Sequence, residues 1–276
     1  MPSSGHSSEA IVVRRPSLAL DAEIPRYWKG GDPFATHFMN ALSSVFPDGE
    51  AFFVLSVLHY QNEIDDPELR TAIKAFAAQE GQHSGQHDRH VAMLLDQGYR
   101  AIATRNRIVR RVTRWSVKRA PRLSLAGTAA LEHLTALLAR KLLRSPERWT
   151  GDMDARMARL WQWHALEEAE HKAVAFDVLA RVAPSYSLRV FSQLTNTLGL
   201  FVEILDRTAY MLWKDGLLFR RKVWAGGFRF LLGRDGLLRG LGADYRAWYR
   251  RDFHPNDSDD SELIAAWRPR IASRAA

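Results

Sequence analysis

Two stretches of this 276-residue chain place a histidine three residues after a glutamate within strongly helical sequence. They are Glu80-Gly81-Gln82-His83 and Glu168-Ala169-Glu170-His171. At about 100° per residue, side chains three apart lie about 60° apart around a helix, so both can bind one metal ion. One such pair arises easily by chance, but two on separate helices predict a metal site between helices.

A site of this kind needs one inward-facing glutamate from each of two further helices, and the sequence contains both. Glu50 precedes the apolar run Ala51-Phe52-Phe53-Val54-Leu55, and Glu132 lies inside the apolar segment Ala129–Leu138. A carboxylate is costly to bury in such surroundings unless it is paired or binds a metal. The competing interpretation, in which these acids and histidines form surface pairs along helices, does not explain these two acids.

The spacing around two predicted turns brings these residues to matching levels. The first lone glutamate and the first Glu-x-x-His pair are centred on Asp65, in the turn Asp65-Asp66-Pro67. The second lone glutamate and the second pair are centred on Thr150, also in a predicted turn. Residues equally far from the turn of an antiparallel hairpin lie side by side, at about 1.5 Å rise per residue. Each glutamate is therefore expected beside its own Glu-x-x-His pair.

Apolar residues at three- and four-residue spacing predict an all-α fold, in which two helical hairpins pack as a four-helix bundle with additional C-terminal helices. The expected core helices cover 34–62 (broken or kinked at Pro47 and Gly49), 67–96, 124–144 and 152–182, with a basic connector over 100–122. The predicted parts are a loose arm (1–33), the core (34–184), a helical extension packed on it (185–253) and a polar tail (254–276).

Further polar residues crowd around the second pair. His164, seven residues before His171, shares its helix face and is expected to be a third ligand there. Periodicity alone does not choose between Glu167 and Glu168, but the spacing of the first pair favours Glu168 as the ligand. Glu167 then accepts the outward N–H of a ligating imidazole and is our candidate catalytic residue. Glu170 is expected to be a surface acid.

The remaining histidines are less constrained. His87, four residues after His83, is either a ligand or a hydrogen-bond partner behind one. Asp177 is a further candidate for such a supporting position. We expect His133 to be structural, and we interpret three others as ordinary polar histidines: His37, His59 and His90.

This combination of residues resembles the ferritin-like di-iron and di-manganese carboxylate proteins. With Phe46-Pro47-Asp48-Gly49-Glu50 and Asp252-Phe253-His254-Pro255, it is similar to a bacterial family described as predicted metal-dependent hydrolases, over roughly residues 10 to 260. The spacing from His164 to His171 is similar to that of the p-aminobenzoate N-oxygenases, ferritin-like di-iron enzymes with an additional histidine ligand on the last core helix. The resemblance implies a ferritin-like core and these ligands: Glu50, Glu80, His83, Glu132, His164, Glu168 and His171.

The chemistry expected of the site follows from the available ligands. The chain has no cysteine, which excludes disulfides, iron–sulfur clusters and cysteine nucleophiles. Carboxylates and imidazoles suit two ions of iron, or of manganese as the second choice. We expect this centre to activate O₂ and to oxidise or oxygenate an apolar or aromatic small molecule. Hydrolysis by a two-metal-activated water and non-catalytic metal binding are the alternatives.

The charge distribution bears on partners. The net charge is +8, with nine Lys/Arg and no acid from Arg100 to Arg122. No nucleic-acid-binding motif accompanies these charges, so we expect no nucleic-acid partner. The basic, aromatic C-terminal helices instead favour contact with an anionic membrane surface. A second copy of the chain, in a homodimer, is the other candidate partner. The N-terminus lacks an apolar core of signal-peptide length and no segment spans a membrane convincingly, so we expect a cytoplasmic protein.

Overall fold

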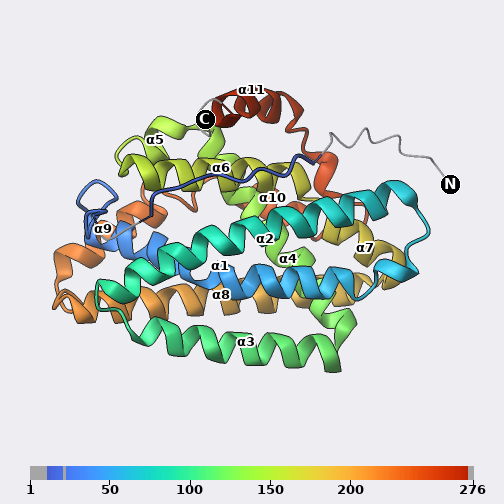
Figure 1. Cartoon of the computed structure of the whole chain (residues 1–276), viewed down its shortest axis with the longest axis horizontal. Coiled ribbons are helices and arrows are strands. Elements are labelled where there is room, and N and C mark those ends of the chain that lie inside the picture. Colours follow the sequence, from blue (N-terminus) through green and yellow to red (C-terminus); the bar gives the residue numbers. More distant parts are fainter. Residues whose placement is uncertain (1–10, 21–22, 273–276) are drawn as a thin grey trace.

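The computed structural model describes residues 11–20 and 23–272, and this part of the chain is all-α, without a β-strand (Figure 1). Short 3₁₀ turns lie at Gln61–Glu63 and Pro255–Asp257. The α-helices are α1 Pro33–Leu58, α2 Pro67–Asp96, α3 Ala101–Arg119, α4 Pro121–Arg144, α5 Pro146–Thr150, α6 Ala155–His171, α7 Val174–Val182, α8 Tyr186–Lys214, α9 Arg221–Leu232, α10 Gly242–Ala247 and α11 Ser261–Ala272. The predicted fold class is confirmed.

The first hairpin consists of α1 and α2, which pack along their length. Asp66 begins α2, because its carboxylate accepts hydrogen bonds from the backbone N–H groups of Glu68 and Leu69. Pro67 occupies the first helical position, where its missing N–H costs nothing. In Figure 1, α1 lies between α2 and α8, and it also contacts α3 and α4. The helix that carries Glu50 is thus surrounded on most sides.

The first core helix was predicted to be broken or kinked at Pro47 and Gly49, and the break is wrong. The helix continues through Pro47 and Gly49 to Leu58, although a proline inside a helix removes one hydrogen bond. Phe46 and Glu50, on either side of this position, are buried. Tertiary packing of both neighbours outweighs the local preference for a break.

The second hairpin is formed by α4 and α6, joined through the short α5. The helix expected over 152–182 divides in two, because α6 ends at His171 and α7 begins at Val174. Lys172 lies in the turn between them, and its ammonium group donates to the carboxylate of Asp260. This buried pairing ties the turn after His171 to the segment that precedes α11.

The basic segment expected to be a connector is instead the helix α3. Its inner face buries Ile102, Asn106 and Val117 against the rest of the protein. Most of its arginines are exposed. The segment therefore adds a helix to the side of the core rather than merely linking its two hairpins.

The N-terminal segment is more ordered than the predicted loose arm. Over the described residues 11–20 it follows α2, where Gln79 and Gln86 donate side-chain hydrogen bonds to the carbonyls of Val12 and Pro16. Leu18 is buried. The predicted arm also includes residues 1–10 and 21–22, which lie outside the described residues.

The predicted polar tail is wrong for most of its length. Residues Ser261–Ala272 form α11, which contacts α6 and α4 and buries Ile264, Trp267 and Ile271. The apolar spacing of these three residues explains the helix. Residues 273–276 of the predicted tail lie outside the described residues.

One helical stretch, Pro33–Glu63, is long and apolar enough to cross a membrane, with a mean hydropathy of 1.4. However, 72% of its most apolar window is buried inside the protein. This burial is typical of a core helix, and α1 occupies such a position.

Candidate metal centre

The seven residues predicted as ligands meet in the interior, from α1, α2, α4 and α6. Each is at most 3% exposed. Together with His87, their donor atoms form overlapping groups of three, within which all atoms lie within 4.8 Å of one another. The groups are Glu80, Glu132 and His171; Glu50, Glu80 and His83; His83, His164 and Glu168; and Glu50, His87 and His164. We call the seven predicted residues (Glu50, Glu80, His83, Glu132, His164, Glu168 and His171) the ligand cluster.

The ring of His171 is oriented by a residue that the sequence did not suggest. Its Nδ1–H donates to the side-chain oxygen of Gln79 at 2.8 Å. The free lone pair on Nε2 then points at carboxylate oxygens of Glu80 and Glu132, at 3.0 and 3.3 Å. A lone pair facing two carboxylates is unfavourable unless a proton or a cation lies between them.

The ring of His83 is also oriented by a hydrogen bond at the nitrogen that faces away from the cluster. Its Nε2–H donates to Glu167 at 3.1 Å, while Nδ1 faces Glu80 and Glu168, each at 3.8 Å. Glu167 therefore lies behind a ring whose other nitrogen faces the cluster, and Glu168 lies inside. This is the arrangement that the spacing favoured, and a carboxylate behind a histidine is the usual support of a metal ligand.

A buried chain of hydrogen bonds fixes the tautomer of His164. Asn40 Oδ1 is an acceptor, so His90 donates to it from Nε2, at 3.1 Å, and exposes a bare Nδ1. Ser43 donates to that Nδ1 at 2.6 Å and accepts from His87 Nδ1–H at 2.7 Å. His87 Nε2 is then bare and accepts from His164 Nδ1–H at 2.6 Å.

The end of this chain is the Nε2 lone pair of His164, which lies 2.9 Å from Glu168 Oε1. All rings in the chain are buried, and burial lowers the pKa of His90 to about 3 and that of His87 well below its usual range. The histidines of this hydrogen-bond chain are therefore neutral, in agreement with the tautomers given above. His87 lies behind His164, which is one of the two positions predicted for it.

The carboxylates of the cluster test whether metal ions fit. Neither oxygen of Glu50, Glu80 or Glu132 makes a hydrogen bond with a described residue, and the same holds for Glu168 Oε2. Buried polar atoms are almost always paired, so several orphans at one point indicate a missing partner. Carboxylate oxygens and imidazole lone pairs directed at one another are a suitable donor set for iron or manganese.

The pKa values reflect this lack of partners. Burial raises the pKa of Glu132 to about 8 and that of Glu50 well above its usual range. Burial lowers the pKa of His83, but the neighbouring Glu167 and Glu80 outweigh it and raise that pKa to about 10. Without metal, protons must hold the cluster together, in the places where metal ions would act.

Glu170 is not the surface acid that was predicted. Its side chain is fully buried, and it accepts hydrogen bonds from Arg14, Gln79 and Arg268. Arg14 also donates to Glu167, which links this arrangement to the support of His83. We call Arg14, Gln79, Glu170 and Arg268 the arginine cluster. Sequence periodicity missed it because Arg14 lies far from these helices along the chain.

Four other predicted residues lie away from the ligand cluster. His133 is buried against the rings of Trp248 and Phe253, which fits a structural position. Asp177 pairs with His254 at 2.8 Å, so it does not support a ligand. His59 is exposed, and His37 is buried and bonded to Asp215 at 2.9 Å.

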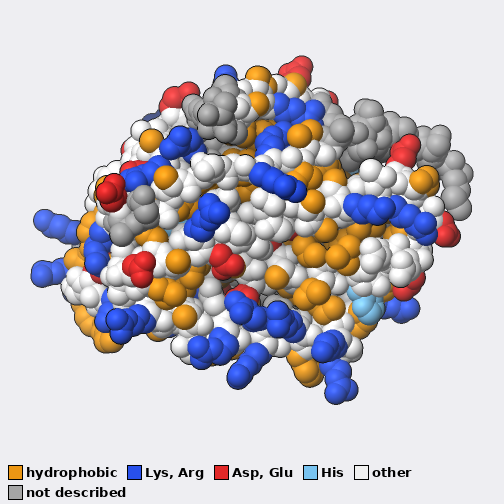
Figure 2. All heavy atoms as spheres, viewed as in Figure 1, with side chains coloured by type: hydrophobic (Ala, Val, Ile, Leu, Met, Phe, Trp, Pro, Cys, Tyr) orange, Lys and Arg blue, Asp and Glu red, His pale blue; other side chains and the backbone are white. Residues whose placement is uncertain are grey.

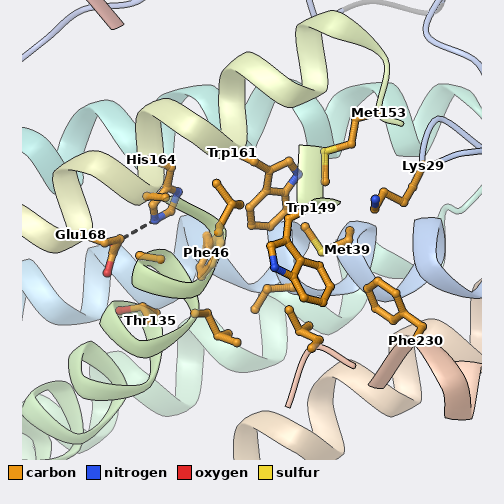
Figure 3. A pocket seen from close by; sticks show the side chains of 16 residues that line it. Lys29, Met39, Phe46, Thr135, Trp149, Met153, Trp161, His164, Glu168 and Phe230 are labelled. Atoms are coloured by element: carbon orange, nitrogen blue, oxygen red, sulfur yellow. Dashed lines mark hydrogen bonds and ion pairs between the residues drawn. The ribbon is translucent and has the colours of Figure 1, made fainter. Parts of the chain in front are cut away.

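An apolar cavity of about 50 Å³ opens beside the cluster (Figure 3). His164 and Glu168 lie at one end, and Lys29 lies toward the other. Between them the wall is apolar, with aromatic side chains such as Phe46 and Trp149 among aliphatic ones. A small apolar group fits there, next to the two residues on the cluster's edge.

Fold and cluster together define the class: an all-α protein with buried glutamates and histidines that can hold metal ions. The chain belongs to the family described as predicted metal-dependent hydrolases, whose model matches residues 12–259. The resemblance to this family, expected over roughly residues 10 to 260, is confirmed. No curated protein and no solved structure matches the chain. The resemblance to ferritin-like carboxylate proteins and to N-oxygenases stays a prediction.

Proposed function

We propose that this chain is a metal-dependent hydrolase whose ligand cluster holds two metal ions. The main support is the set of buried donor atoms in the ligand cluster that have no hydrogen-bond partner among the described residues. The second support is the family, which is described as predicted metal-dependent hydrolases. Bound ions would supply Lewis acidity for the attack of water on the substrate. This places first the reaction that the sequence analysis held as an alternative.

The ligand cluster has two ends, one with Glu132 and His171 and the other with Glu50 and His83, and each end would hold one ion. Glu80 belongs to a group with Glu132 and His171 and to another with Glu50 and His83, so its carboxylate would help to hold both ions. Glu168 Oε1 lies 2.9 Å from His164 Nε2 and 3.7 Å from His171 Nε2, and is a second residue between the ends. The donors favour iron first and manganese second.

The chain's other residues would orient and shield this centre. Glu167 is engaged by His83 through one oxygen and by Arg14 through the other, so we now assign it to orienting His83 rather than to moving a proton. Phe46 and Trp161 pack beside His164 and keep bulk water from that edge. The apolar cavity would hold an apolar part of a small-molecule substrate.

A second candidate is O₂-dependent oxidation of an apolar substrate at two irons, which the sequence analysis placed first. The apolar cavity beside His164 and Glu168 favours it, because such walls bind an apolar group and exclude water. The same donor set serves either reaction.

The test separates the two by metal and by oxygen. Protein loaded with zinc or manganese, without O₂, is assayed on esters that carry small apolar acyl groups. Hydrolysis is expected, is lost in Glu132→Gln, and persists in the exposed control Glu63→Gln. Rapid O₂ consumption after ferrous loading, with no ester turnover, would assign the second candidate. Metal binding without either activity would contradict both.

A further inference from the structure

The first half of α8 has its apolar side outward. Phe191, Leu194 and Leu198 are 54–65% exposed, and their spacing places them on one stripe of the helix. The buried residues of the same half are polar: Arg189, Ser192 and Gln193. A surface helix normally shows the opposite pattern, so this stripe is expected to contact another apolar phase.

The stripe is long and uncharged. No charged residue occurs from Val190 to Val202, a length of about 20 Å at 1.5 Å per residue. Phe201 and Val202 are also exposed and extend the stripe. An uninterrupted exposed row of this length exceeds the scattered apolar residues usual on a protein surface.

A second apolar stripe lies on α3, the neighbouring helix. Ile108, Val112 and Trp115 are each more than half exposed, at four- and three-residue spacing. Arg105 continues this stripe by one turn and forms an ion pair with Asp206 of α8. The start of the α3 stripe therefore lies beside the second half of α8, and in Figure 1 both helices are drawn along the lower side of the molecule.

The remaining surface of α3 is strongly basic. Nine Lys/Arg and no acid occur from Arg100 to Arg122, and Figure 2 shows Lys and Arg side chains along the edge of the molecule that α3 forms. Arg107, Arg111 and Arg114 are exposed. We call the apolar stripes of α3 and α8, with these arginines, the α3–α8 face.

We propose that the α3–α8 face lies on the surface of an anionic phospholipid bilayer. The apolar stripes would enter the boundary between headgroups and acyl chains, as amphipathic helices do when they lie in the plane of a membrane. The arginines beside them would pair with lipid phosphates, and each basic residue near such a surface adds to binding.

Charge argues against a second copy of the chain as the occupant. A symmetric dimer places the same patch of both subunits in contact. Over this face it would bring two acid-free α3 helices close together, and like charges in contact are destabilising. An anionic surface removes that repulsion and turns the same residues into a source of affinity.

The experiment is flotation of the full-length chain with vesicles of phosphatidylcholine alone or mixed with phosphatidylglycerol. We expect binding to the mixed vesicles, little to the neutral ones, and release at high salt. The double variant Leu198→Glu, Phe201→Glu should abolish binding. Leu55→Glu, an exposed leucine on α1, is the control and should bind as the unaltered chain does.

A second pair of variants tests the charges without altering the apolar stripes. Arg111→Gln with Arg114→Gln should weaken binding to the mixed vesicles about fivefold per charge removed. Lys74→Gln with Arg89→Gln removes two exposed bases from α2 and should leave binding unchanged. Circular dichroism of all variants checks that the helical fold is retained.

Three outcomes would overturn the proposal. They are absence of binding to mixed vesicles, equal binding to neutral and mixed vesicles, and unchanged binding of the Leu198→Glu, Phe201→Glu variant. A dimer in sedimentation that this variant dissociates, without vesicle binding, would assign the face to a second copy instead. The metal sites are untouched by these substitutions, so the result is independent of the proposed reaction.

Discussion

Glu168 and Glu170 lie two residues apart on α6, and both side chains are buried, but their surroundings are opposite. Glu170 belongs to the arginine cluster, where both of its oxygens accept from Arg14 and further bonds come from Gln79 and Arg268. Burial raises the pKa of Glu170, but the arginines outweigh it and hold that pKa below its usual value. This carboxylate is fully satisfied by the chain itself.

Glu168 belongs to the ligand cluster, where no arginine or lysine of the described chain pairs with a glutamate. Its neighbours are imidazoles and other carboxylates. Burial raises the pKa of Glu168, but His164 and His171 outweigh it and hold that pKa well below its usual value, so imidazoles do here what arginines do for Glu170. The difference teaches how to interpret a buried acid. One that arginines surround stabilises the fold, whereas one left with unpaired oxygens among histidine lone pairs is suited to a metal ion.

The largest expected effect tests Glu168 itself. Replacement of Glu168 by alanine removes a carboxylate between the two ends of the cluster, so the chain should lose one of its metal ions. Metal analysis by mass spectrometry after reconstitution measures this. Retention of the full metal content would mean that Glu168 is not a ligand.

The next effect should appear at Glu170, in stability rather than in metal content. Glu170→Gln replaces the anionic, bidentate partner of the half-buried Arg14 guanidinium with a neutral amide, and losing hydrogen bonds between charged groups costs about 1.5–3 kcal/mol. Urea unfolding of the metal-free protein should show this loss, whereas Glu132→Gln should leave stability unchanged or higher. Equal destabilisation by both substitutions would remove the distinction between the two clusters.

A smaller effect is expected at Glu167, which touches both clusters. Glu167→Gln weakens the hydrogen bond that orients His83 but removes no ligand, so metal affinity should fall about 10–100-fold with an unchanged number of ions. Competition with a chelator gives the affinity. Loss of an ion in this variant would exchange the roles of Glu167 and Glu168.

The smallest effect per pH unit concerns the neutral hydrogen-bond chain behind His164. His90 has a pKa of about 3 in the folded protein because it is buried, against about 6.5 when unfolded. As pH falls below 6.5, the unfolded state takes up the proton first, so stability decreases by up to about 1.4 kcal/mol per pH unit until pH approaches 3. Urea unfolding at a series of pH values should show a shallower slope in His90→Gln and an unchanged one in the exposed control His59→Gln.

Sequence spacing predicted the helical fold and the meeting of the ligand cluster because both follow from local rules. A three-residue step fixes two side chains on one helix face, and equal distances from a turn bring two helices into register. The same rules placed Glu168 inward and Glu167 behind it, as the contacts of His83 now have them.

The errors arose where distant parts of the chain decide the structure. Glu170 was assigned to the surface from its position around the helix. Its partner Arg14 lies 156 residues away along the chain, so helix periodicity could not predict this contact. The polar tail was expected from its acids, but one of them, Asp260, pairs with Lys172 at the turn after His171. The chain of hydrogen bonds from Asn40 to His164 was not predicted, because Ser43, which joins His87 to His90, carries no distinctive signal in the sequence.

The central claim is that the ligand cluster holds two metal ions, and metal stoichiometry tests it most directly. The purified chain is stripped with a chelator, reconstituted with ferrous iron or with manganese under anaerobic conditions, desalted and analysed for metal and protein. Two ions per chain are expected in the unaltered protein and in Glu63→Gln, and fewer in Glu168→Ala. Far fewer than two ions in the unaltered protein, with either metal, would contradict the account.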